Sequence, residues 1–425
     1  MIAWLLISFF VLLFLGVPIA MSLGLSAIGG ILFLGGGSTV TIAQRMFEGM
    51  NSFALLAIPL YTFAGFTMSK GGISKRLMDF CYSIVGHIYG GLAHVNVLSS
   101  MIFAGISGSA VADTAGVSGM FMPEMIRKGY SKNFTVAVTA ISSTIGIIIP
   151  PSIPMVVIAG ICGISTGKLF LGGIIPGIMC GIAQMIVSYF LAKKEGVPKE
   201  PGHFTIGPVL HGLWESWPAL LMPIIIVGTI TMGIVSPTEA GVIAVVYGLI
   251  AGGLVYRELK WEDIKFAFAE TVRTSGRIFI VIGAAKLYTV MLTTAGFDKW
   301  VAKTMLGFST NPTVILIMIL LIFFIVTMFM ESIATLTLFM PILYPIAIGV
   351  GIDPIVLSVL ITMVIGIGLV TPPVGMCIYV ACDLMDTTVG EVFPTLVPFI
   401  AATFVCIALM VAFPQLILLP TYLMA

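Results

Sequence analysis

The chain has 425 residues, of which 59% are apolar and only 9% charged, and its mean hydropathy is +1.17. So little charge excludes a soluble globular domain and predicts an all-α protein that crosses the lipid bilayer several times. The net charge is +1 without a basic cluster, so nothing indicates a nucleic-acid partner. The six cysteines lie mostly in apolar runs without metal-ligand spacing, which indicates packing residues.

The N-terminal part predicts two short helices followed by one span. Residues 2–36 are apolar throughout, too long for one span, and interrupted by Gly-Val-Pro at 16–18. A semi-polar segment near 41–51 then leads into a span near 53–69. We expect residues 1–69 to form the first scaffold helices.

Two basic clusters flank the next stretch: Lys70, Lys75 and Arg76 before it, and Arg127, Lys128 and Lys132 after it. Basic loops face the cytoplasm, so the chain between them must leave and return on the same side. An interfacial helix near 73–85 and a re-entrant hairpin with its tip at Ser107–Ser109 satisfy this condition. Two complete crossings satisfy it as well, but the small polar residues at the tip favour the hairpin.

A broken helix follows the hairpin. Residues 133–164 contain Pro150, Pro151 and Pro154, which remove three backbone donors inside an apolar span. Carbonyls freed at this depth are tolerated only beside protein or a polar cavity, where they can bind ions. Residues 70–192 are therefore predicted to form the first transport half.

The second half is expected to follow a junction at residues 193–217, centred on the long polar loop 195–212. Residues 218–296 then form the second scaffold and arm region. Its predicted elements are spans at 218–235 and 238–256, an amphipathic interfacial helix at 261–277, and a span at 278–293.

The two halves share short motifs. Phe-Met-Pro at 121–123 recurs at 339–341, and the proline pair 150–151 recurs at 372–373. The offsets, 218 and 222, are nearly equal, and the order is the same, which predicts an internal repeat. Paired interrupted apolar segments in two halves are typical of secondary transporters.

The second transport half is predicted at 297–425. A hairpin at 312–348 has its tip near 330–335, a broken helix runs from 354 to 384, and a last span covers 394–418. Counting crossings, the first hairpin opens toward the cytoplasm and the second toward the opposite side. The repeat is therefore expected to have inverted topology.

Four ionisable residues within or beside the spans need an explanation. Glu331 lies inside the second hairpin and is a functional candidate, because an uncompensated charge at that depth costs a few kcal/mol. Asp113 lies one turn after the first tip, and either faces the site or caps a helix. Glu239, in Ser-Pro-Thr-Glu, predicts a helix N-cap. For Lys286, in mid-span, structural and functional roles are both open.

Several motifs carry a resemblance: GISGSAVADTAGVSGMFMPEM, the proline pair after IGIII, SPTEAG, and GLVTPPVGM. With them the whole chain resembles the large membrane (M, DctM-like) subunit of tripartite ATP-independent periplasmic (TRAP) transporters. The resemblance implies a scaffold and a moving transport domain in the bacterial inner membrane, working as a sodium-coupled elevator. It also implies a small four-helix membrane subunit and a periplasmic substrate-binding protein as partners.

The resemblance assigns site residues by motif. One sodium site is expected at Ser107, Ser109, Gly146, Ile149 and Pro151. A second is expected at Glu331, Gly368, Thr371 and Val374. The carboxylated substrate is expected near Ser109, Asp113, Ser152 and Glu331. Of the two sodium sets, the first contains no carboxylate and the second contains one.

The predicted function is thus sodium-driven import of a carboxylated solute of the sialic acid or C4-dicarboxylate class, without enzyme activity. One alternative is a stand-alone carrier of related fold. Another is an intramembrane serine protease, since Ser107 and Ser118 lie in Gly-x-Ser-Gly motifs, but the chain has 47 glycines and no histidine placed as a base.

Overall fold

The computed structural model describes residues 1–34, 38–197 and 205–424. Within these ranges the regular structure is entirely helical, and seven helices are long and apolar enough to cross a membrane. This confirms the all-α membrane class. Residues 198–204 of the predicted junction, and residues 35–37 at the end of the predicted N-terminal pair, lie outside the described residues.

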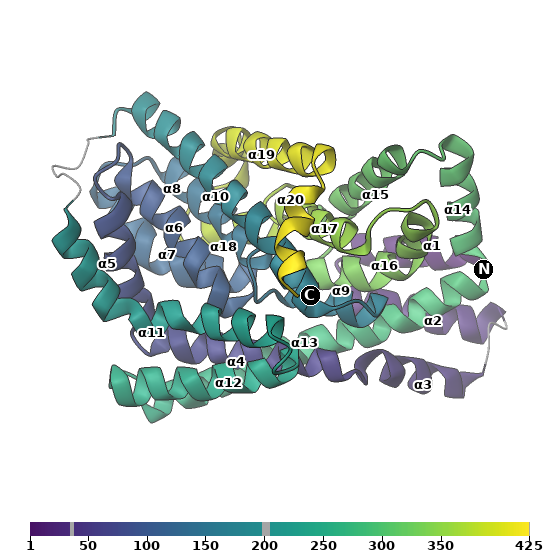
Figure 1. The fold of residues 1–425 in the computed structure, drawn as a ribbon. Helices are drawn as coiled ribbons and strands as arrows, with labels where there is room; N and C mark the ends of the chain where they lie inside the picture. Colours follow the sequence, from purple (N-terminus) through teal and green to yellow (C-terminus); the bar gives the residue numbers. More distant parts are fainter. Residues whose placement is uncertain (35–37, 198–204, 425) are drawn as a thin grey trace.

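One layer of helices is organised around α13 and is called the α13 layer (Figure 1, lower half). In it α13 packs against α2, α3 and α4, while α12 packs against α4 and α1 against α2. Its elements are α1 (Ile2–Phe14), α2 (Ile19–Leu34), α3 (Thr39–Met50), the 3-10 turn η1 (Phe53–Leu56), α4 (Ala57–Lys70), α12 (Pro237–Ile250), the π-helical turn η3 (Ala251–Val255) and α13 (Trp261–Thr294).

Local signals fix the ends of these helices. The Ser236 hydroxyl accepts a hydrogen bond from the Glu239 amide at 3.3 Å, and the Glu239 carboxylate accepts one from the Ser236 amide at 2.6 Å. This capping box confirms the role predicted for Glu239. The Tyr61 hydroxyl on α4 donates to the Pro237 carbonyl at 2.8 Å, which ties α4 to the start of α12.

The second layer contains two helical hairpins and two broken helices and is called the hairpin layer (Figure 1). Its first half consists of α6 (Gly91–Ser107), α7 (Ala110–Arg127), α8 (Lys132–Ser143), η2 (Thr144–Ile147), α9 (Ile153–Cys162) and α10 (Thr166–Glu195). Its second half consists of α15 (Pro312–Thr327), α16 (Ser332–Gly349), α17 (Pro354–Gly368), α18 (Met376–Asp383), α19 (Val389–Ala412), α20 (Gln415–Leu418) and η4 (Leu419–Met424).

Three further helices connect these layers. Helix α5 (Ile73–Val85) packs against α11 (Ile206–Thr231), and α14 (Phe297–Phe308) contacts the hairpin α15–α16. The Ser216 hydroxyl on α11 donates to the Arg76 carbonyl on α5 at 2.9 Å. The bounds of α5 coincide with the predicted interfacial helix.

The two halves of the hairpin layer exchange contacts symmetrically. Helices α7 and α8 pack against α18, while their repeat equivalents α16 and α17 pack against α9. A side-chain carbon on Gly366 would lie 3.4 Å from Cβ of Thr144, which is its equivalent at the 222-residue offset. Contact between a position and its own equivalent is what a twofold axis produces. The predicted inverted repeat is thus a twofold arrangement of hairpins and broken helices.

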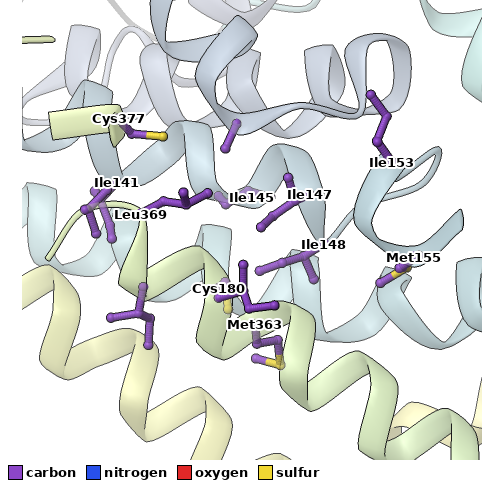
Figure 2. Packing of buried hydrophobic residues seen from close by; sticks show 14 of the residues in the cluster. Ile141, Ile145, Ile147, Ile148, Ile153, Met155, Cys180, Met363, Leu369 and Cys377 are labelled. Carbon is purple, nitrogen blue, oxygen red and sulfur yellow. The ribbon is translucent and has the colours of Figure 1, made fainter. Parts of the chain in front are cut away.

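The broken helices form the centre of the core. Figure 2 shows Ile145, Ile147 and Ile148 of the first break beside Met363 and Leu369 of the second. All five side chains are at most 3% exposed. Their branched and flexible side chains fill the space between the breaks, so both interrupted segments are held from within the protein.

Three predicted boundaries are wrong. The interfacial helix 261–277 and the span 278–293 form one helix, α13, because no proline interrupts them, and its 34 residues span about 50 Å. The last span begins at Val389, since α19 accommodates Pro394 internally. Helix α11 begins at Ile206, inside the predicted loop 195–212.

Candidate functional site

The first hairpin turns within two residues. Gly108 has φ +65°, a conformation that favours glycine, and ends α6; Ser109 then caps α7, its hydroxyl accepting from the Ala112 amide at 3.4 Å. The Ser107 hydroxyl donates to the carboxylate of Asp113. Ser107 and Asp113 are both buried, so the tip ends inside the protein. This confirms the re-entrant hairpin over two complete crossings.

The first broken helix is unwound between Ile147 and Ile153, and the Pro150-Pro151 peptide is cis. Ser152 closes the gap. Its hydroxyl donates to the Ile147 carbonyl at 2.6 Å and accepts from the Met155 amide at 3.3 Å, capping α9. The predicted substrate hydroxyl of Ser152 therefore binds backbone groups in this structure.

The tip and the break are in direct contact. The Ile153 amide donates to the Gly108 carbonyl at 3.2 Å. A side chain on Gly108 would place Cβ 2.6 Å from the Pro151 carbonyl oxygen, and one on Gly146 would collide with the Asp113 carboxylate. The structure thus brings together the tip residues and the break residues that the sequence assigned to the first sodium site.

Asp113 adds a carboxyl group to this region. One of its oxygens accepts from Ser107, and the other has no hydrogen-bond partner among the described residues and faces Gly146. The sequence argument treated the first sodium set as free of carboxylate and assigned Asp113 to the substrate. In the fold, Asp113 lies against that set, because one helical turn separates it from Ser109.

The second tip repeats this design. Glu331 caps α16, its carboxylate accepting from the amides of Ile333 at 3.0 Å and Ala334 at 3.2 Å, and from the Ser332 hydroxyl at 2.8 Å. Ser109 and Glu331 are separated by 222 residues, so one oxygen-bearing cap occupies the same repeat position in both hairpins.

The second break also contacts its hairpin. The Val374 amide donates to the Met328 carbonyl at 2.9 Å, and a side chain on Gly368 would place Cβ 2.6 Å from Cβ of Thr327. The Thr371 hydroxyl donates to the Ile367 carbonyl at 2.8 Å. Glu331 differs from its expected neighbours, since every hydrogen bond that its carboxylate makes to a described residue stays within its own helix end.

Both regions offer the donor atoms that sodium prefers. The carbonyl oxygens of Ile149, Pro151 and Val374 accept no hydrogen bond from a described residue. Carbonyls in unwound helices supply oxygen ligands without net charge, and the nearby carboxyl groups can balance a cation. The residue types therefore fit a monovalent cation as a transported ion.

Sequence reasoning missed the hairpin-2 residues that contact the break. Thr327 and Met328 precede the predicted tip 330–335, and nothing in their types distinguishes them from other apolar-arm residues. The near-equal offset could have found one of them. The hydrogen-bonded pairs Gly108–Ile153 and Met328–Val374 are related by 220 and 221 residues.

Paired hairpins facing paired helix breaks across a twofold axis define a secondary-transporter type of membrane protein. A solved structure of the YdaH transporter from Alcanivorax borkumensis has this fold, with a TM-score of 0.61, 13% identity, and coverage of 87% of this chain and 86% of that one.

Residues 6–416 match the family model for the tripartite ATP-independent periplasmic transporter, DctM component. The chain belongs to this family of large TRAP permease subunits. It is a multi-pass membrane transport protein, and its relatives are transporter permeases rather than enzymes.

Three relatives illustrate the family. The large permease SiaM of a Vibrio cholerae sialic acid TRAP transporter is 35% identical over 96% of this chain and 95% of its own. The C4-dicarboxylate large permease DctM of Pseudomonas aeruginosa is 34% identical over 95% and 94%. The isethionate permease DctMQ of Oleidesulfovibrio alaskensis is 37% identical over 92% of this chain. The chain spans 62% of that relative's length.

Proposed function

We propose that this chain is the large permease subunit of a sodium-coupled importer for a small organic anion in the bacterial inner membrane. The substrate class is a carboxylated acid such as sialic acid or a C4-dicarboxylate, as named for the relatives SiaM and DctM. A small four-helix membrane subunit and a periplasmic substrate-binding protein are the proposed partners.

The observation that supports this proposal is the matched contact of each hairpin tip with a helix break. Gly108 with Ile153, and Met328 with Val374, each join the tip backbone to unwound backbone. Ion ligands drawn from both members of such a pair would connect ion binding to closure of the hairpin. Ion and substrate binding would then be coupled through the same few contacts.

We further propose that the hairpin layer is the transport domain and the α13 layer the scaffold, moving relative to one another as an elevator. The halves of the hairpin layer exchange helices across the twofold axis, which makes that layer one interlocked body. Motion between the layers then breaks fewer contacts than motion within the hairpin layer.

The test is uptake into proteoliposomes at fixed membrane potential. We expect labelled substrate to accumulate under an inward sodium gradient only when the small subunit and a loaded binding protein are present. A potassium gradient of equal size is the control for the ion. Robust sodium-driven uptake by this chain alone would favour the stand-alone carrier, and uptake that ignores sodium would refute the coupling.

A further inference from the structure

A cavity of about 180 Å³ lies between the two layers, away from both hairpin tips. The α13 layer contributes Glu48, Ser52 and Lys286 to its wall, together with apolar groups. The hairpin layer contributes α9 and α16, through Val157, Gly160, Ile161, Thr337 and Pro341. The polar and charged groups thus lie largely on one wall, and the opposite wall is mainly apolar.

Lys286 is a cation within a membrane-spanning helix. It is half-buried on α13, and no carboxylate of the described residues lies within ion-pair distance of its ammonium group. A charge at this depth is costly unless it faces a cavity or a partner, so its place in this wall requires a function. Its stem is fixed, because a side chain on Gly49 would place Cβ 2.6 Å from Cβ of Lys286.

Glu48 does not neutralise this lysine by direct contact. Its carboxylate binds Arg45 at 2.7 Å on the same helix, and 53% of its side chain is exposed. The hydrogen bond and charge of Arg45, and to a smaller degree the charge of Lys286, lower the pKa of Glu48. Counting Arg45, this edge of the cavity carries two cations and one anion.

Ser52 supplies a second donor. It precedes η1, but its hydroxyl does not cap that helix and has no hydrogen-bond partner among the described residues. The Thr337 hydroxyl, on the opposite wall, already donates to the Ile333 carbonyl at 2.7 Å and so presents lone pairs to the cavity. An ammonium and a hydroxyl donor facing an apolar wall are the arrangement that orients a small organic anion.

We propose that this cavity binds the anionic group of a small organic acid through the Lys286 ammonium and the Ser52 hydroxyl. The hydrocarbon part of the acid then lies against Val157 and Ile161. The inference rests on the proposed function, since it assigns the charge of the transported solute to a lysine of the α13 layer. It adds a binding residue outside the hairpin tips and helix breaks.

The test is calorimetric titration of the purified full chain with succinate, isethionate and N-acetylneuraminate, at constant sodium and low ionic strength. Succinamide, the uncharged analogue of succinate, is the ligand control. Lys286→Gln keeps the stem against Gly49 and removes the charge. We expect it to weaken binding of the anion that the wild type binds by about tenfold, the lower range for a hydrogen bond to a charged group.

Three variants separate anion binding from a structural role. Lys286→Arg should retain binding within a few-fold, and Lys303→Gln, on exposed α14, should behave as wild type. Glu48→Gln should bind the anion as well as or better than wild type, because it removes a nearby negative charge. Weakening by Glu48→Gln as large as that by Lys286→Gln would assign the effect to the charge pair and overturn the proposal.

Wild-type protein that binds none of the three acids, or Lys286→Gln with unchanged affinity, would also overturn the proposal. These failures differ from failure of the proposed function, which is measured as sodium-driven uptake with the partners present. Normal uptake with unchanged binding in Lys286→Gln would refute only the cavity. Lysine-dependent binding without sodium-driven uptake would refute only the coupling.

Discussion

Gly146→Ala is the substitution whose effect the structure defines most sharply. The added methyl group would collide with the Asp113 carboxylate, which is fully buried and hydrogen-bonded to Ser107. Overpacking a buried site of this kind costs about 1–3 kcal/mol. We therefore expect a lower apparent unfolding temperature and a higher sodium concentration for half-maximal uptake, since the Gly146 carbonyl belongs to the proposed first site.

The matched control is Gly119→Ala on α7, where an added Cβ meets nothing within 4 Å. Alanine is favoured over glycine within a helix by up to about 1 kcal/mol, so this variant should be as stable as wild type or more stable. Both variants are heated in detergent at the same scan rate, because unfolding of membrane proteins is often irreversible.

A double-mutant cycle tests the cause. Asp113→Ala removes the group that the new methyl meets, so Gly146→Ala should cost less in that background than in wild type. The coupling is expected to reach about 1 kcal/mol or more. Additive effects of the two substitutions, or Gly146→Ala with wild-type stability and sodium dependence, would refute the contact.

The remaining predictions use the same uptake and stability assays. Glu331→Gln should need more sodium for half-maximal uptake, whereas Glu331→Asp should be tolerated; equal sodium curves for wild type and Glu331→Gln would remove Glu331 from the second site. Ser109→Ala loses a cap worth about 0.5–2 kcal/mol and a proposed ligand, so stability and sodium affinity should both fall. Ser236→Ala should cost about 1 kcal/mol with an unchanged sodium curve, and a change in that curve would contradict its purely structural role. Single cysteines at 126–132 should react with a membrane-impermeant maleimide only after the cells are opened; labelling in intact cells would contradict the predicted topology.

The sequence by itself determined the membrane class, the repeat and the interrupted segments. These follow from composition and from prolines and glycines, whose backbone effects are local and need no partner. The hairpin tip at Ser107–Ser109, the break at Pro150-Pro151 and the cap at Glu239 were predictable for this reason. The length of α13 was not, because an amphipathic stretch and an apolar stretch give the same pattern whether they form one helix or two.

Only the tertiary structure decided which of these parts meet. The contact between Asp113 and Gly146 joins residues 33 positions apart, and the one between Gly366 and Thr144 joins the two halves of the chain. The cavity at Lys286 combines α3, α9, α13 and α16. Such contacts depend on how helices pack across the twofold axis and between layers, and apolar side chains at those interfaces are too alike in type to specify partners from their order along the chain.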